Sequence, residues 1–183
     1  MQIGSKRKTL YCGIHLKRCE CLSFVQSHTN NKMKKTLLVF LVIFLQNIWA
    51  QSELDDLIDG LHQDAHEGNF QTYFDRYSVD AIFLGTDKTE RWSIEEFKAY
   101  AEPAFADGHG WTYEVVERNW EGDGQTRWFD EILFNEKLGH CRGTGVVEWI
   151  EGEWKIAHYA LTMLVPNAIA AEVGSQTIEA DKL

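Results

Sequence analysis

The feature that most constrains the fold of this chain is a series of four long segments rich in β-branched and aromatic residues. They occupy residues 111–121, 125–135, 140–150 and 153–165. The few residues between neighbouring segments include glycine each time, so each segment is expected to pair with the next as an antiparallel hairpin. Because these strands exceed the usual length of about 5–6 residues, the sheet is expected to twist and curl.

Helical signals precede these strands. Five apolar residues fall on one face at helical spacing: Leu54, Leu57, Ile58, Leu61 and Ala65. Gly68 and Asn69 are expected to end this helix. A short second helix over residues 70–77 and a strand over residues 79–85 are expected to follow.

A third helix is predicted from a capping box. Ser93 and Glu96 have the spacing at which each side chain bonds the backbone N–H of the other residue, and Pro103 is expected to kink or restart the helix. Helices followed by a long meander predict an α+β fold, with the N-terminal helices packed in the concave face of a curved antiparallel sheet. Such a sheet forms a cone-shaped barrel with an internal cavity.

The first fifty residues differ in composition from the rest of the chain. They hold eight Lys and Arg and one acid, whereas residues 51–183 hold ten bases and 27 acids, a net charge of -17. The sequence MKKT at 33–36 precedes nine apolar residues at 37–45. This layout is typical of a secretory signal peptide over residues 33–50, cleaved before Gln51. A membrane span is less favoured because nine helical residues cannot cross a hydrocarbon core of ~30 Å.

A signal that starts at Met33 leaves residues 1–32 without a role, and we interpret them as an over-long gene start outside the fold. Three cysteines lie there, Cys12, Cys19 and Cys21, with His15 nearby. Their spacing lacks the paired arms of a structural zinc site, so no metal is expected. Cys141 is then the single cysteine of the exported domain, whose fold must depend on its core.

Short motifs within residues 54–167 carry a resemblance to a known family. They are FLGTD at 83–87, ERW at 90–92, WFDE at 128–131, RGTG at 142–145 and WKIAHY at 154–159, with VPN at 165–167. In this order they resemble a SnoaL-like domain of the nuclear transport factor 2-like superfamily. The resemblance implies a cone-shaped α+β fold with a cavity, often dimeric through the sheet. It does not imply one reaction, because the superfamily includes isomerases, cyclases, dehydratases and assembly modules.

Asp130 is the first candidate for catalysis. Alternation along its predicted strand places it on one face with three large apolar residues, Trp128, Ile132 and Phe134. Desolvation there would raise its pKa toward the range useful for a general acid or base. Alternatively, this face lies outward at a dimer interface, or Asp130 pairs with Arg142 or Arg127. Glu131 would then be the solvated neighbour, and a register error of one residue would exchange the two.

His158 is the second candidate for catalysis. It shares a strand face with Trp154, Ile156 and Ala160, and an imidazole in apolar surroundings can transfer a proton near neutral pH. The alternative is a core histidine with satisfied hydrogen bonds. The resemblance implies that this strand lines the cavity.

Six further residues are candidate ligand contacts: His62, Tyr73, Trp92, Trp111, Trp128 and Arg142. The aromatic residues could line a pocket for a flat apolar molecule or simply build the core. Arg142 could hold a carboxylate or a developing oxyanion, a role that Tyr73 could share, or it could pair with a nearby acid. The spacing of His62 and His66 on one helix could bind a metal, but the sequence dictates no third ligand.

These observations favour an exported domain that binds a small, largely apolar organic molecule. With no cofactor, Asp130 and His158 would act as base and acid in an isomerase, hydratase or lyase reaction. The alternative is a non-catalytic module that dimerises or sequesters a ligand, with the same two side chains as a structural pair. We expect a homodimer, no stable membrane span after cleavage, and no nucleic-acid partner, because phosphates need a basic surface.

Overall fold

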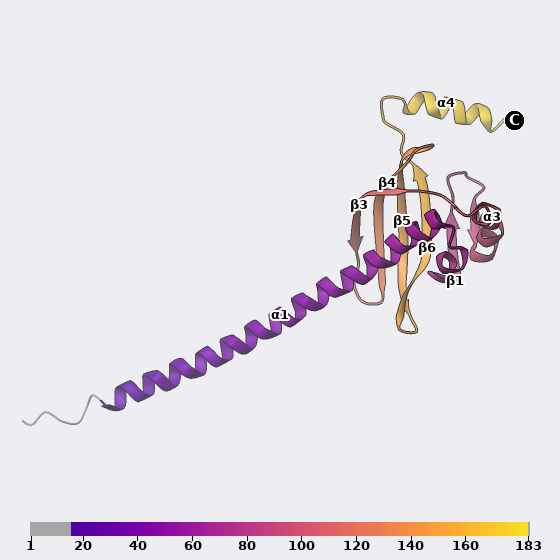
Figure 1. Cartoon of the computed structure of the whole chain (residues 1–183). Helices are drawn as coiled ribbons and strands as arrows, with labels where there is room; N and C mark the ends of the chain where they lie inside the picture. Colours follow the sequence, from indigo (N-terminus) through magenta and orange to yellow (C-terminus); the bar gives the residue numbers. More distant parts are fainter. Residues whose placement is uncertain (1–15, 183) are drawn as a thin grey trace, which may run out of the picture. The chain divides into compact units, whose positions relative to one another are not determined.

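The computed structural model describes the backbone of residues 16–182 and the side chains of residues 33–41 and 51–182 (Figure 1). The chain divides into two units, Met1–Gln51 and Ser52–Leu183. Helix α1 spans Leu16–Glu67. Within the described residues, no helix combines the length and the apolarity that a membrane crossing needs. The candidate metal ligands among residues 12–21 lie outside the described side chains.

The apolar helical face predicted over residues 54–65 is confirmed. Leu54, Ile58, Leu61 and Ala65 are all buried. The helix ends at Glu67, and Gly68 follows with a φ of +73°, the left-handed conformation that glycine adopts most easily after a helix. The Asn69 N–H then donates to the Asp64 carbonyl oxygen over 2.8 Å, which satisfies one of the last helical carbonyls.

The next elements are short and lead to the third helix. They are α2 (Phe70–Asp75), β1 (Tyr77–Leu84) and β2 (Arg91–Ser93), followed by α3 (Ile94–Ala106). The predicted capping box is present, with Ser93 and Glu96 bonding reciprocally. Pro103 lies inside α3, which continues through it to Ala106.

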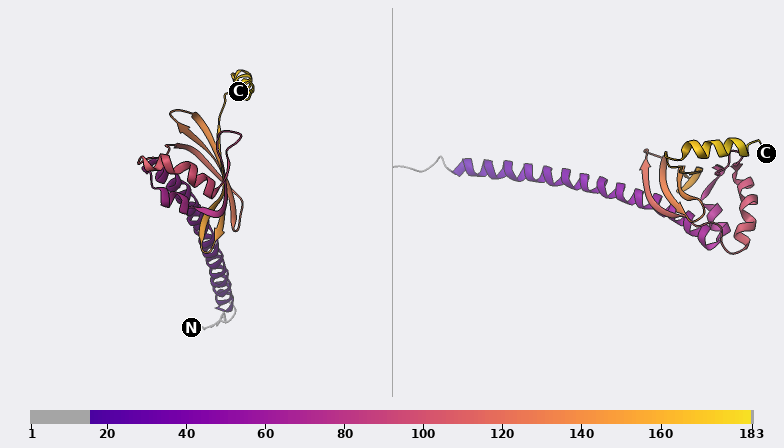
Figure 2. Two further views of the ribbon diagram at one scale, coloured as in Figure 1. Left: turned by 90° about the vertical axis from the view of Figure 1, so that its right-hand side faces the viewer. Right: turned by 90° about the horizontal axis from the view of Figure 1, so that it is seen from above.

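The predicted meander is confirmed. Its strands are β3 (Glu114–Glu121), β4 (Thr126–Asn135), β5 (Gly139–Ile150) and β6 (Glu153–Met163). The six strands form one open sheet in the order β2-β1-β6-β5-β4-β3, and α2 and α3 lie on one side of its curve (Figure 2).

The sheet is mixed and not wholly antiparallel as expected, because β1 runs parallel to β6. Parallel neighbours need a long connection, which α3 and the whole meander supply here. The segment after Asn167 is Ala-rich and then acidic, a composition that predicts a frayed end. It instead forms helix α4 (Ala170–Ala180), none of whose residues is buried.

The core lies between the helices and the concave face of the sheet. It contains the buried residues of α1 and α3 together with Phe129 of β4, Val147 of β5, and Ile156 and Tyr159 of β6. Aromatic residues dominate the part nearest α2 and α3, where the rings of Phe74 and Phe97 meet edge to face with centroids 5.3 Å apart. This cluster leaves an open space between the helices and the sheet.

Candidate functional site

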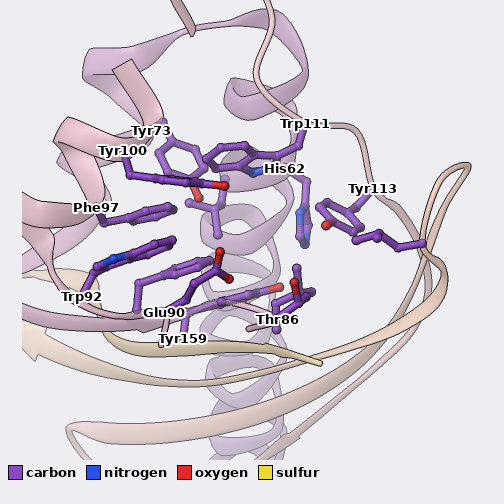
Figure 3. Close-up of a pocket in the computed structure, with 15 residues that line it drawn as sticks. His62, Tyr73, Thr86, Glu90, Trp92, Phe97, Tyr100, Trp111, Tyr113 and Tyr159 are labelled. Atoms are coloured by element: carbon purple, nitrogen blue, oxygen red, sulfur yellow. The ribbon is translucent and has the colours of Figure 1, made fainter. Parts of the chain in front are cut away.

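A cavity of about 180 Å³ opens between the helices and the concave face of the sheet (Figure 3). Four predicted ligand contacts line it: His62 from α1, Tyr73 from α2, Trp92 from β2, and Trp111 from the segment before β3. The lining also includes residues that were not predicted as ligand contacts, namely Phe83, Thr86, Glu90, Phe97, Tyr100, Tyr113 and Tyr159. The cavity is therefore mostly aromatic, with a few polar groups.

One buried carboxylate organises the polar side of this cavity. Glu131 of β4 has no exposed surface, and its Oε1 lies 3.0 Å from the His62 Nε2. The Tyr159 hydroxyl donates to the same oxygen over 2.8 Å. Arg118 of β3 donates to Oε2 through Nε at 3.0 Å and Nη2 at 2.9 Å. Both oxygens of a fully buried acid are thus satisfied, as a buried charge requires.

The ionisation states of these groups follow from their surroundings. Burial by itself would raise the pKa of Glu131, but the hydrogen bond of His62 and its charge when it is protonated, the charge of Arg118 and the Tyr159 hydroxyl together hold that pKa below its ordinary value. Burial and the adjacent Glu131 charge raise the pKa of Tyr159 well above its ordinary value. Glu131 is therefore an anion that only accepts hydrogen bonds, and Tyr159 keeps its proton.

An ionised Glu131 also determines the tautomer of His62. Because the carboxylate can only accept, the proton of a neutral imidazole lies on Nε2. Nδ1 then keeps its lone pair, and it has no hydrogen-bond partner among the described residues. The His62 side chain is only 11% exposed, and it lines both the cavity and an outer hollow formed with Asp59 and His66. An imidazole held in this way can accept a proton from a bound molecule and exchange it with solvent.

Arg118 is positioned by a second layer of acids. Its Nη1 donates to Asp59 of α1 over 2.8 Å, and Trp120 of β3 donates its indole N–H to Asp55 over 2.8 Å. These contacts connect β3 to the two turns of α1 that precede His62. Sequence reasoning missed Arg118, because its partner Glu131 lies on the adjacent strand and was expected on the opposite face.

The expected faces of Asp130 and Glu131 are exchanged, which corrects the sequence prediction. Phe129, Glu131 and Leu133 are buried, whereas Trp128 is 52% exposed. Each of the two alternating sets on β4 combines large apolar residues with one acid, so alternation alone did not identify the inner one. The neighbouring strand holds the missing signal, because Gly143 and Gly145 face Glu131 and Phe129 across the ladder. A Cβ at 143 would lie 2.8 Å from the Glu131 Oε1.

The other predicted site residues lie on the outer face of the sheet with Asp130. Cross-strand pairing places Arg142 beside Ile132, and Val146 between Trp128 and His158. None of Asp130, Arg142, Trp128 and His158 lines the cavity. Burial, with a contribution from the Arg91 charge, lowers the pKa of His158. The structure therefore separates the two predicted catalytic residues from the cavity, although it leaves them on one face.

The spacing of His62 and His66 does not produce a metal centre in the described structure. His62 bonds Glu131, while the His66 Nδ1 lies 2.9 Å from the Thr112 hydroxyl. Within the part of the chain whose side chains are described, no group of three or more His, Cys, Asp or Glu residues is arranged to hold a metal ion.

Comparison with known proteins places this geometry in a family. The model of the SnoaL-like domain matches residues 54–166, close to the range in which the sequence motifs occur. No curated protein matches the chain significantly.

Several solved structures share the fold at low sequence identity. An NTF2-like protein of unknown function from Pseudomonas putida KT2440 has a TM-score of 0.56 and 14% identity over 66% of this chain and 90% of its own. An NTF2-like protein with a cystatin-like fold from Novosphingobium aromaticivorans has a TM-score of 0.54 and 14% identity, over 72% and 93%. A second protein from that organism, provisionally described as a scytalone dehydratase, has a TM-score of 0.56 and 8% identity, over 65% and 87%.

Proposed function

The chain belongs to the SnoaL-like domain family, and from this premise we propose that its aromatic cavity binds a small organic molecule on which His62 performs acid–base chemistry without a cofactor. The observation that carries the proposal is the hydrogen bond of 3.0 Å between the buried Glu131 and His62, which lines that cavity. The carboxylate orients the imidazole and stabilises the imidazolium that forms when His62 takes a proton. Isomerisation, hydration and elimination all need such a step.

A hydrogen-bond donor beside His62 supports the same chemistry. The Tyr113 ring centroid lies 6.4 Å from that of His62, and burial raises the pKa of Tyr113 to about 12. Its hydroxyl therefore stays protonated and can stabilise negative charge that develops when His62 removes a proton. This role replaces the one expected for Arg142, which lies outside the cavity.

The test uses a generic proton-abstraction probe of suitable shape, 5-nitrobenzisoxazole. A base removes the ring C–H proton, the N–O bond breaks, and the coloured cyanophenolate forms. We expect the wild-type protein to accelerate this elimination and His62→Gln to reduce the rate by about a hundredfold, the lower end of the usual contribution of a general base of about 10²–10⁴. His158→Gln is the matched control, because His158 lies on the outer face, and it should keep the wild-type rate.

Two outcomes would contradict the assignment. If His158→Gln loses the activity and His62→Gln keeps it, the sequence prediction is right and the His62 assignment is wrong. If the probe binds in the cavity but reacts no faster than in buffer, the domain is a ligand-sequestering module in which Glu131 and His62 are a structural pair.

We also propose that the domain is exported. The apolar run at 37–45 with its preceding lysines is the first support. The boundary between the two units, after Gln51, falls one residue from the predicted cleavage after Ala50. N-terminal sequencing of the protein from its native cells should begin at Gln51, and a start near Met1 would refute the proposal.

We further propose that two copies of the domain form a homodimer through the outer face of the sheet. Trp128 and Phe134 are exposed by 52% and 37%, and exposed apolar patches on a soluble domain commonly mark interaction surfaces. Sedimentation should give a dimer for the wild-type protein and a monomer for Trp128→Glu. A wild-type monomer would contradict this part alone.

A further inference from the structure

We propose that the cavity selects a flat ring compound that donates a hydrogen bond, from a hydroxyl or an amine, to the Glu90 carboxylate, and that it rejects carboxylates. This inference rests on the proposed ligand-binding function and adds the chemical class of the ligand. Glu90 was not a predicted site residue, and it takes no part in the His62–Glu131 pair.

The loop between β1 and β2 fixes the Glu90 carboxylate in the cavity wall. The Asp87 backbone N–H donates to Glu90 Oε2 over 3.0 Å, and the Glu90 N–H donates to the Asp87 carbonyl over 3.0 Å. Gly85 provides the space, because a Cβ at that position would overlap the same Oε2. The side chain is therefore held by its loop.

The charge of the lining determines which ligands this carboxylate accepts. Among the residues whose side chains the structure describes, no Lys or Arg lines the cavity, and the Glu90 Oε1 has no hydrogen-bond donor. A ligand that covers this oxygen removes its water, which is unfavourable unless the ligand supplies a donor. A carboxylate ligand would instead place two anions together without a cation between them.

The aromatic lining determines the shape of the ligand. Neighbouring rings are nearly parallel, with interplanar angles of 6° for Trp92 and Phe97, 10° for Phe83 and Tyr159 and 19° for Phe97 and Trp111. A flat ring that lies parallel to these planes makes offset stacking contacts with several of them. The volume of about 180 Å³ exceeds the ~150 Å³ of a cavity known to bind benzene, so the space suits one or two fused rings.

The polar groups of the cavity lie on two sides, and together they determine how a ligand is oriented. Figure 3 shows Glu90 and His62 entering the cavity from different sides, with Tyr113 beside His62. A ring anchored at Glu90 through its donor therefore presents another edge to His62. Glu90 thus acts as a specificity residue, separate from the proton acceptor.

The experiment compares matched naphthalene derivatives by calorimetric titration of the full-length protein. The probes are 2-naphthol, 2-naphthylmethylamine, 2-methoxynaphthalene and 2-naphthoate. The wild-type protein should bind the two donors most tightly and naphthoate most weakly. Glu90→Gln should weaken the donors about tenfold, as expected for losing a bond to a charged acceptor, leave methoxynaphthalene within about twofold and improve naphthoate.

Two further variants separate ligand selection from folding effects. Gly85→Ala displaces the carboxylate through its new Cβ and should cause the same donor-selective loss. Glu102→Gln is the matched control, because Glu102 is exposed on the same structural unit and does not line the cavity; it should bind every probe like the wild type. Thermal melting of each variant checks that the fold is intact.

Each outcome has a distinct meaning. Tighter binding of naphthol than of the amine assigns a neutral hydroxyl as the donor, and the reverse order assigns a cation; both support the proposal. Tightest binding of naphthoate by the wild type, or an equal loss for all probes in Glu90→Gln, overturns the proposal but leaves the ligand-binding function intact. If no probe binds the wild type, the proposed ligand-binding function itself fails.

Discussion

The two faces of the sheet carry similar side chains and differ in what covers them. The concave face has Glu131, Arg118 and Tyr159 beneath the His62 of α1. The outer face has Asp130, Arg142 and His158. Each therefore has an acid, an arginine and a histidine within reach of its strands. On the concave face helix α1 removes water, and the charged groups bond one another in a fixed geometry.

This difference shows that residue type alone does not define a candidate catalytic site. An exposed ion pair contributes little and has no fixed orientation. A buried carboxylate must have every oxygen satisfied, and that requirement also fixes the tautomer of His62. Matched substitutions on the two faces therefore test the comparison directly.

The largest expected difference in stability is between substitutions of two neighbouring aromatic residues on β4, Phe129 and Trp128. Phe129→Ala should reduce the free energy of unfolding by about 4 kcal/mol, because it leaves a cavity in the core. Trp128→Ala, on the outer face, should cost less than about 1 kcal/mol in the monomer. Urea unfolding measured at low protein concentration checks both values. Equal losses would mean that the outer face is as buried as the inner one.

Substitutions of the two neighbouring acids, Glu131 and Asp130, should differ almost as much in their effect on stability. Glu131→Gln should cost about 3 kcal/mol, because it removes the charge that compensates the buried Arg118. Asp130→Asn should stay within about 0.5 kcal/mol of the wild type. The same unfolding measurements apply, and a larger effect at Asp130 would restore the face assignment predicted from the sequence.

The loss of stability caused by Glu131→Gln should also depend on pH. The pKa of the folded carboxyl lies below its ordinary value of 4.5, so its contribution to stability is fully present above that value and is lost as the pH falls through the folded pKa. The difference between wild type and Glu131→Gln should therefore shrink in acid. A constant difference across this range would contradict the ionised state assigned to Glu131.

The smallest expected difference in stability is between substitutions of two neighbouring residues on β5, Gly143 and Thr144. Gly143→Ala places a Cβ against the Tyr159 hydroxyl and the Glu131 carboxylate, and such overpacking costs about 2 kcal/mol. Thr144→Ala, one residue along on the outer face, should change the stability by no more than about 0.5 kcal/mol. Thermal melting compares the two variants. A neutral Gly143→Ala would show that the buried network can move away from β5.

Much of the fold was predictable because its signals are local. The turns between the strands, the capping box at Ser93 and the helical face after Leu54 each depend on residues close together in the chain, and all appear in the structure. The parallel pairing of β1 with β6 was not predictable in the same way. It depends on how a connection of some seventy residues returns, which no local pattern records.

In the candidate site too, residues with a local sequence signal were predicted and residues that depend on tertiary contacts were not. His62, Tyr73, Trp92 and Trp111 were identified from helical spacing and aromatic content, and the structure brings all four to one cavity. Glu131 and Arg118 were missed because their value comes from mutual burial across two strands. Glu90 was missed because its position depends on a loop and on the missing side chain of Gly85.

The sequence by itself determined the order of the three helices and the four meander strands, the strongly acidic domain and the aromatic content that a cavity could use. The tertiary structure decided which of two alternating faces is buried, and it joined His62 to Glu131, 69 residues apart. The physical reason is that a strand's period of two defines two faces without saying which one a helix will cover. Covering one face removes its water, and only then does a carboxylate there require the partners that make a site.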